Sequence, residues 1–155
     1  MTERFEMRPI GWVRCPRKEP VDDGWDTVAA SIELDPEQFG PDALQGLDAF
    51  SYVEVLFVFD RVDAAEVETG TRHPRGRADW PDVGIFAQRA SARPNRIGAT
   101  ICRIVVVSGT RLQVTGLDAI DGTPVLDLKP VMSGFLPRGD VAEPVWAQAI
   151  TRDYW

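Results

Sequence analysis

Apolar and polar residues alternate along much of this chain, in segments short enough for β-strands. Successive side chains of a strand point to opposite faces, so such alternation marks strands with one buried face. Residues 50–59 are the most apolar segment and are rich in aromatic and β-branched residues, which indicates a central strand. Strands are predicted at residues 7–13, 29–34, 50–59, 99–107, 112–117 and 125–129. The pattern therefore predicts a mainly β protein.

Helical patterns are short and few. Asp35-Pro36 has the form of an N-cap followed by a proline at the first helical position, and predicts a short helix. Residues 144–155 predict a C-terminal helix in which Trp146, Ile150 and Tyr154 share one face. Such a face must be covered, either by the rest of the domain or by a partner.

Two turn signals separate the last three predicted strands. Ser108-Gly109-Thr110-Arg111 predicts a turn before residues 112–117. Asp121-Gly122 lies between two apolar runs and favours a tight hairpin, because glycine tolerates the positive φ of such turns. We therefore expect residues 112–117 and 125–129 to pair with each other.

The last predicted strand has one polar face. Strand periodicity places Leu126 and Leu128 on one side and Asp127 and Lys129 on the other. The polar side is either part of a site or an exposed ion pair of little energetic worth.

Composition is that of an ordinary globular domain, with 44% apolar and 26% charged residues in 155. One domain over residues 1–155 is expected. No run of about 18 apolar residues occurs, and the first residues lack the basic and apolar regions of a signal peptide, so we expect a cytoplasmic protein that does not bind a membrane. Cys15 and Cys102 match no metal-binding spacing, so reduced thiols and no metal site are expected.

Charge is unevenly distributed along the chain. Residues 72–103 hold seven arginines against two aspartates, a net charge of +5, which leaves −12 for the rest of a chain whose total is −7. One positive patch on an acidic body fits either a polyanion or a single anionic small molecule.

The densest part of that patch is the segment 84–98, with Arg89, Arg93 and Arg96 close to Pro94 and Asn95. Proline and the closing Gly98 favour a loop. Such a loop can present planar groups with several donors to a carboxylate, a phosphate or a base edge. A solvated basic loop without a ligand is the alternative.

Several common sites are absent from the sequence. It contains no glycine-rich dinucleotide-binding loop, no phosphate-binding loop ending in Gly-Lys-Ser/Thr, no Cys/His zinc spacing and no nucleophile elbow. Any nucleotide-like cofactor must therefore be held by another arrangement.

Six segments resemble the TsaA-like (TrmO) family over about four fifths of the chain. They are Ile10-Gly11, Gly46-Leu47-Asp48-Ala49-Phe50-Ser51, Phe86-Ala87-x-Arg89, Arg93-Pro94-Asn95-x-Ile97-Gly98, Leu117-Asp118-x-x-Asp121-Gly122-Thr123-Pro124-Val125-Leu126-Asp127 and Lys129-Pro130. Members of that family are S-adenosylmethionine-dependent methyltransferases with a small β-barrel-like core. The characterised members methylate N6 of threonylcarbamoyladenosine at position 37 of tRNA, beside the anticodon.

The resemblance implies a site for S-adenosylmethionine. Gly116, Leu117 and Asp118 are expected at its adenosyl group, and Arg89 at its carboxylate or closing the adenine slot. The remaining predicted cofactor residues are Phe86 as a wall of that slot, Ala99, and the loops Asp23-Gly24-Trp25 and Val62-Asp63. These loops complete the site within one subunit or across the interface of a homodimer.

Four residues are predicted on the methyl-acceptor side. Arg93 and Asn95 are expected to bind the acceptor, with Asn95 pairing with an amide or base edge. Lys129 is expected to meet a carboxylate such as that of the threonyl group, and Asp127 to orient Lys129 or take a proton late. We predict Asn95, Asp127 and Lys129 as the catalytic residues.

The family pattern is not matched everywhere. The departures are at residues 90–91, at Arg96, and at Val131-Met132 after Lys129-Pro130. They lie near the expected acceptor side, so two alternatives to tRNA methylation stay open. One is a methyltransferase acting on a small metabolite, and the other is a non-catalytic module that binds S-adenosylmethionine.

Overall fold

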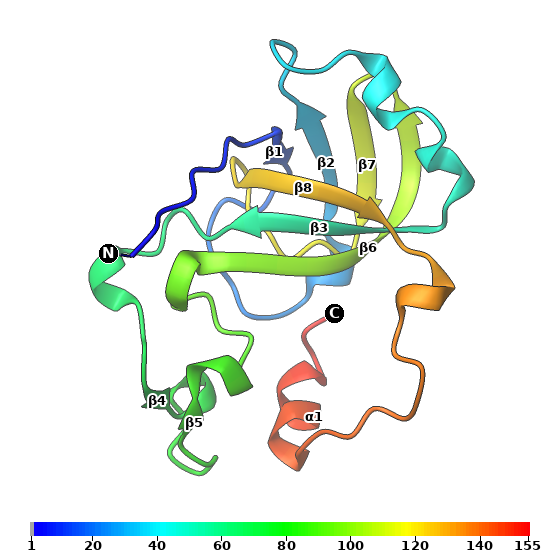
Figure 1. Cartoon of the computed structure of the whole chain (residues 1–155). Coiled ribbons are helices and arrows are strands. Elements are labelled where there is room, and N and C mark those ends of the chain that lie inside the picture. Colours follow the sequence, from blue (N-terminus) through cyan, green and yellow to red (C-terminus); the bar gives the residue numbers. More distant parts are fainter. Residues whose placement is uncertain (1) are drawn as a thin grey trace.

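Antiparallel strands close into a six-stranded barrel in the computed structural model, which describes residues 2–155 (Figure 1). Around the barrel the order is β1, β2, β7, β6, β3 and β8, and β8 pairs with β1 to close it. The bounds are β1 (Gly11–Arg14), β2 (Ala29–Leu34), β3 (Tyr52–Val58), β6 (Ile97–Ser108), β7 (Arg111–Thr115) and β8 (Pro124–Pro130). The prediction of a mainly β, barrel-like fold is confirmed, although the first strand starts at Gly11 rather than at residue 7.

Alternate residues of these strands fill the barrel. Val55 and Phe57 on β3, and Leu112 and Val114 on β7, are 1% exposed or less. Burying each such side chain stabilises the fold by about 1.5 to 3 kcal/mol. Gly98 on β6 pairs with Phe57, and a Cβ at Gly98 would lie 2.4 Å from the ring. A glycine at this position is therefore what lets the ring fill the barrel.

Only one of the two predicted hairpins forms. The turn at Gly109, which has φ +60°, joins β6 to β7 as expected. The Asp121-Gly122 hairpin is wrong, because β7 pairs with β2 and β6 whereas β8 pairs with β1 and β3. Asp121 instead binds the end of β1: its carboxylate accepts from the Cys15 amide at 3.1 Å, and the Gly122 amide donates to the Val13 carbonyl at 2.8 Å.

A β-bulge interrupts the expected alternation of β8. Leu56 of β3 pairs with Asp127, but the next residue, Phe57, pairs with Val125, so Leu126 has no opposite residue. Val125 is fully buried in the barrel, and Leu126 lies outside it. The prediction that Leu126 shares a face with Leu128 is therefore wrong, since an extra residue shifts every side chain before it to the other face.

Residues between the strands form short helical turns and one small sheet. The 3-10 helices are η1 (Trp25–Thr27), η2 (Pro41–Leu44), η3 (Leu47–Ala49), η4 (Ala64–Glu66), η5 (Pro74–Gly76), η6 (Ile85–Ala87), η7 (Pro94–Arg96) and η8 (Ser133–Phe135). β4 (Thr71–Arg72) pairs with β5 (Val83–Gly84) below the barrel in Figure 1. The helix predicted at Asp35-Pro36 is a single turn, in which the Asp35 carboxylate accepts from the Glu37 amide at 3.0 Å.

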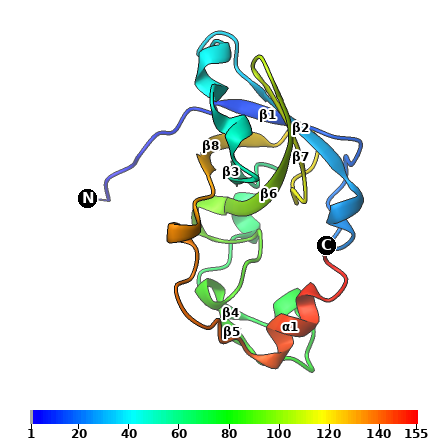
Figure 2. The same cartoon turned by 90° about the vertical axis from the view of Figure 1, so that its right-hand side faces the viewer.

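The only α-helix among residues 2–155 is α1 (Val145–Thr151), shorter than the predicted 144–155. Figures 1 and 2 show α1 beside the β4–β5 sheet, with the chain after α1 returning to the barrel. Trp146, Ile150 and Tyr154 are half-buried, as their common face predicts. Within residues 2–155, no helix has the length and apolar character needed to cross a membrane.

Candidate functional site

The loop 116–123, between β7 and β8, closes one end of the barrel. Leu117 and Ala119 point into the core, where they are 0% and 3% exposed. Asp118 lies between them and is half-buried. Gly116 starts the loop with φ +74°, and a Cβ there would lie 3.2 Å from the Asp26 carboxylate. Of the three predicted adenosyl residues, only Asp118 offers a polar side chain.

Both carboxylate oxygens of Asp118 accept hydrogen bonds from hydroxyl groups. Thr100, on an inward-facing position of β6, donates to one oxygen, and Tyr154, beyond α1, donates to the other. Burial raises the pKa of Tyr154, and the charge of Asp118 raises this pKa further. Burial, with a smaller effect of Asp118, also raises the pKa of Cys102. Asp118 is thus a carboxylate held in one orientation by neutral donors.

The predicted loop Asp23-Gly24-Trp25 lies beside this carboxylate. The amides of Gly24 and Trp25 donate to the carbonyls of Asp153 and Tyr154 at 3.1 and 3.0 Å, so the same C-terminal residues contact both the loop and Asp118. Asp23 is paired with Arg75 at 2.8 Å. The loop and Asp118 are therefore linked through the C-terminal residues, and the cofactor role of the loop stays a prediction.

Trp25 itself is covered. Its ring is 4% exposed, packs with Val28, Ile120 and Tyr154, and lies 4.2 Å from the Arg17 guanidinium. The indole Nε1 has no hydrogen-bond partner among residues 2–155. Trp25 thus contacts Tyr154 both through its backbone amide and through its ring.

Arg89 and Ala99 are in direct contact at the same end of the barrel. The Arg89 guanidinium donates to the Ala99 carbonyl at 2.5 Å, next to Thr100. Its charge lowers the pKa of Tyr154, opposing the larger effects of burial and Asp118, so Arg89 lies within electrostatic range of that hydroxyl. Phe86, by contrast, is 76% exposed, while its neighbour Ile85 is buried. The Phe86 ring therefore walls no slot within this chain.

The predicted residues Val62 and Asp63 have other contacts. The Val62 carbonyl accepts from the Arg96 guanidinium at 2.6 Å. Asp63 caps η4, with its carboxylate accepting from the Ala65 amide at 2.9 Å while Glu66 binds the Asp63 amide. No hydrogen bond within residues 2–155 links this loop to Asp118.

The arginine loop is held by main-chain carbonyls. The Arg93 guanidinium donates to the Gln88 carbonyl at 2.7 Å, as Arg96 does to Val62. Asn95 and Arg96 both have positive φ, 61° and 51°, so the chain turns sharply here. Because carbonyls are neutral, these bonds leave the positive charges of Arg89, Arg93 and Arg96 uncompensated, whereas Arg75 and Arg77 are paired with aspartates.

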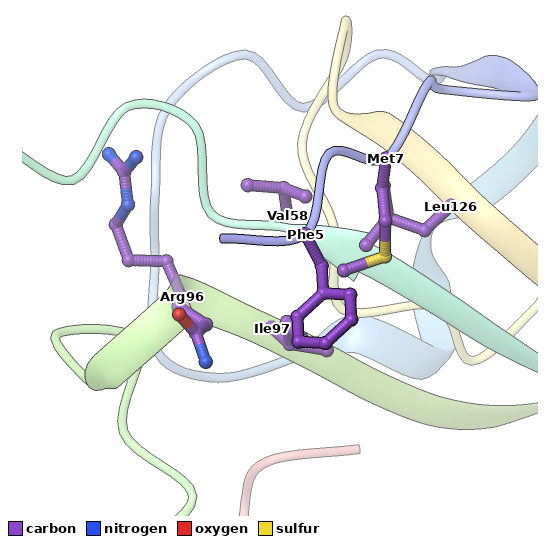
Figure 3. A pocket seen from close by; sticks show the side chains of 7 residues that line it. Phe5, Met7, Val58, Arg96, Ile97 and Leu126 are labelled. Atoms are coloured by element: carbon purple, nitrogen blue, oxygen red, sulfur yellow. The ribbon is translucent and has the colours of Figure 1, made fainter. Parts of the chain in front are cut away.

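Asn95 lines a cavity of about 500 Å³. The lining of this cavity includes none of Asp118, Thr100 and Tyr154. Figure 3 shows Phe5 and Met7, from the chain before β1, beside Ile97 and Leu126. Five of its seven lining residues are apolar, and Asn95 and Arg96 are the other two. One predicted acceptor residue thus borders an open pocket with both polar and apolar surface.

Asp127 and Lys129 lie on the outer face of β8. Their side chains form an ion pair at 3.1 Å and are 48% and 61% exposed. One Asp127 oxygen also accepts from the Leu128 amide at 2.8 Å, and Lys129 is opposite Glu54 of β3. The pair is therefore accessible to a ligand of any size.

Sequence reasoning missed Thr100, Tyr154 and Arg75. Thr100 stands at an inward position of a predicted apolar strand, and that unusual placement was an available signal. Tyr154 was predicted only as part of an apolar helix face, which carries no information about its hydroxyl. Arg75, through its bonds to Asp23 and to the Ile150 carbonyl at 3.2 Å, joins two loops that sequence spacing does not connect. No group of three possible metal ligands occurs among residues 2–155.

A profile described as the tRNA-methyltransferase O N-terminal domain matches residues 14–135. A probable S-adenosyl-L-methionine-binding protein of Pyrococcus abyssi is 35% identical over 143 residues, covering 89% of this chain and 72% of that protein. The human tRNA (adenine(37)-N6)-methyltransferase is 36% identical over 103 residues, 66% of this chain but only 23% of the human protein. The crystal structure of TrmO from Pseudomonas aeruginosa aligns with a TM-score of 0.74 and 28% identity, over 92% of this chain and 63% of that one.

Proposed function

This chain belongs to the family of the tRNA-methyltransferase O N-terminal domain, and from that premise we propose that it is an S-adenosylmethionine-dependent methyltransferase. The proposed reaction is N6-methylation of threonylcarbamoyladenosine at position 37 of tRNA. The observation that carries the proposal is Asp118, a carboxylate fixed by two hydroxyl donors beside the Asp23-Gly24-Trp25 loop. The names of the human and Pyrococcus relatives support the acceptor and the cofactor respectively.

The groups around Asp118 suit the chemistry of S-adenosylmethionine. Asp118 is an acceptor for ribose hydroxyls, and the amides of Gly24 and Trp25 are donors for a carboxylate. The Arg89 guanidinium, bonded only to a neutral carbonyl, adds a positive charge for the same carboxylate. In the proposed site Gly116 and Leu117 contribute backbone groups, because the Leu117 side chain is buried in the core.

When bound, S-adenosylmethionine supplies an activated methyl group on a sulfonium. The protein then needs mainly to hold the acceptor nitrogen close to and in line with that methyl group. Asn95, Lys129 and Arg93 are the residues proposed to hold the acceptor. Lys129, exposed and paired only with Asp127, is free to exchange that partner for a substrate carboxylate, and Asp127 keeps it in position meanwhile.

Binding of tRNA is supported by the distribution of charge. The three arginines bonded to carbonyls, Arg89, Arg93 and Arg96, keep their positive charge within eight residues of sequence. A cluster of this kind attracts phosphates, while the acidic remainder of the surface limits nonspecific binding.

A homodimer in the cytoplasm completes the proposal. Phe86, Phe135 and Val145 are 76%, 89% and 82% exposed, and side chains of this kind are often covered by another subunit. A second subunit also gives a role to Val62 and Asp63, which have no bond to the Asp118 end of their own chain within residues 2–155. Their loop is proposed to complete the site of the partner.

A labelling experiment tests the function. Purified protein is incubated with methyl-labelled S-adenosylmethionine and tRNA carrying threonylcarbamoyladenosine, and the digested nucleosides are analysed by mass spectrometry. The expected product is labelled N6-methyl-threonylcarbamoyladenosine, absent when unmodified tRNA is supplied. Cofactor binding without this product would contradict the tRNA assignment and direct the search to small acceptors. Absence of cofactor binding would contradict the methyltransferase assignment altogether.

A further inference from the structure

We propose that residues 145–155, here called the C-terminal strap, occupy the cofactor end of the site and must leave it before S-adenosylmethionine binds. This inference rests on the proposed function, because it concerns the same Asp118 end. The strap lies outside residues 14–135, the part of the chain that the tRNA-methyltransferase O N-terminal domain profile matches.

The strap is attached to the site through several polar contacts. The Tyr154 hydroxyl donates to Asp118, and the carbonyls of Asp153 and Tyr154 accept from the amides of Gly24 and Trp25. One turn earlier, the Ile150 carbonyl accepts from Arg75 at 3.2 Å. Figure 1 shows the end of the strap returning toward the barrel below β6. Three of these four contacts are with predicted cofactor residues, namely Asp118, Gly24 and Trp25.

The groups offered by the strap are of the same chemical kinds as those of the cofactor. The phenol hydroxyl donates to Asp118 as a ribose hydroxyl would, and two carbonyl oxygens accept from the loop amides as a carboxylate would. The Tyr154 ring also packs in the apolar cluster of Trp25, Val28 and Ile120. Each of the two loop amides has a single hydrogen, and the Tyr154 side chain covers the Asp118 oxygen that it contacts, so the strap and the cofactor compete for these groups.

The Trp25 side chain carries a donor that the residues around it do not satisfy. Its indole N–H is buried without a partner among residues 2–155, in the cluster that includes Tyr154. A buried donor left without an acceptor costs about 1 to 3 kcal/mol. Tyr154 packs against the same cluster, so its departure opens that cluster to water or to a ligand.

Two full-length variants test the inference, Tyr154→Phe, which removes the hydroxyl, and Tyr154→Ala, which removes the ring as well. The matched control is Tyr52→Phe, at the other tyrosine, on the exposed side of β3. Calorimetry measures the Kd for S-adenosylmethionine. Loss of one hydrogen bond to a competing group is expected to tighten binding about 5- to 10-fold in both Tyr154 variants and to leave the control unchanged.

A second measurement follows the strap itself in the wild-type protein. Trypsin cleavage after Arg152 is timed with and without saturating S-adenosylmethionine, and is expected to be several-fold faster with it. Equal or weaker binding by the Tyr154 variants, or slower cleavage with the cofactor, would overturn the inference and make the strap a wall of the site. If none of the proteins bound the cofactor, the proposed function would fail first, and the inference with it.

Discussion

Asp118 and Asp127 are two carboxylates in similar sequence surroundings, yet they differ in location, exposure and hydrogen-bond partners. Asp118 lies at the closed end of the barrel, with both oxygens bound by the hydroxyls of Thr100 and Tyr154. Asp127 lies on the outer face of β8, 48% exposed, and pairs with Lys129, which is 61% exposed. The first is fixed before any ligand arrives, whereas the second can change partner at little cost.

The difference separates two tasks in the proposed site. A cofactor that must be held in one orientation benefits from a carboxylate whose direction is set by the barrel. An acceptor that is exchanged in every reaction benefits from an accessible ion pair. We therefore expect changes near Asp118 to affect binding and folding, and changes near Asp127 to affect turnover.

The largest effect is expected for Asp118→Ala. This change removes the acceptor of two hydroxyl groups and should weaken binding of S-adenosylmethionine about 100-fold and lower the free energy of unfolding by about 2 kcal/mol. Calorimetry and urea denaturation measure the two quantities. Arg89→Ala should also weaken binding, with a smaller effect on stability, since Arg89 is exposed. Near wild-type affinity in both variants would contradict the proposed cofactor site.

Lys129→Ala should lower turnover about 10- to 100-fold while changing the Kd for the cofactor by less than about 2-fold. The reason is that Lys129 is proposed to hold only the acceptor. Single-turnover methylation of tRNA measures the turnover, and calorimetry measures the Kd for the cofactor. A proportional loss of turnover and of cofactor affinity would place Lys129 on the cofactor side. It would also contradict the proposed difference between Asp118 and Asp127.

Ionisation of Tyr154 should lower the free energy of unfolding in alkaline solution, which is a smaller effect than those above. Because burial and Asp118 raise its pKa above the usual value near 10, its contribution to stability is complete below about pH 10 and is lost as the pH rises through the folded-state pKa. The near-ultraviolet absorbance difference between wild type and Tyr154→Phe should therefore show tyrosinate forming above pH 10. Ionisation at the ordinary pKa would mean that the hydroxyl does not face Asp118.

The smallest effect is expected for Asp127→Ala, which should change the free energy of unfolding by less than about 0.5 kcal/mol, because both partners of its ion pair are well exposed. Urea denaturation at two salt concentrations measures it. A loss of unfolding free energy as large as that of Asp118→Ala would show that the Asp127–Lys129 ion pair stabilises the fold. It would contradict the proposed difference between Asp118 and Asp127.

The sequence was sufficient for the approximate positions of the barrel strands and for the family. Inward positions such as Val55 and Leu112 follow period-2 alternation, which depends only on neighbouring residues. The Leu117-Asp118 motif carried part of the family resemblance, which is confirmed. Strand alternation and a dense sequence motif can both be recognised without knowledge of contacts between residues far apart in the sequence.

Pairing between strands was not readable in the same way. An Asp-Gly turn looks the same whether its flanking strands pair with each other or with other strands, and here β8 pairs with β1 and β3. The bulge at Leu126 is likewise set by how β8 fits against Phe57. Tyr154 reaches Asp118 over 36 residues of sequence, a contact that depends on the path of the whole C-terminal segment.

The contact of Gly98 with the Phe57 ring has a consequence for how such chains vary. Gly98 closes the arginine loop and starts the inward row that continues to Thr100, so it belongs to the site and to the core at once. A Cβ at position 98 fits only if the ring opposite becomes smaller. Among relatives, a residue other than glycine at position 98 should therefore occur together with a smaller side chain at position 57, and the two positions should covary as a pair.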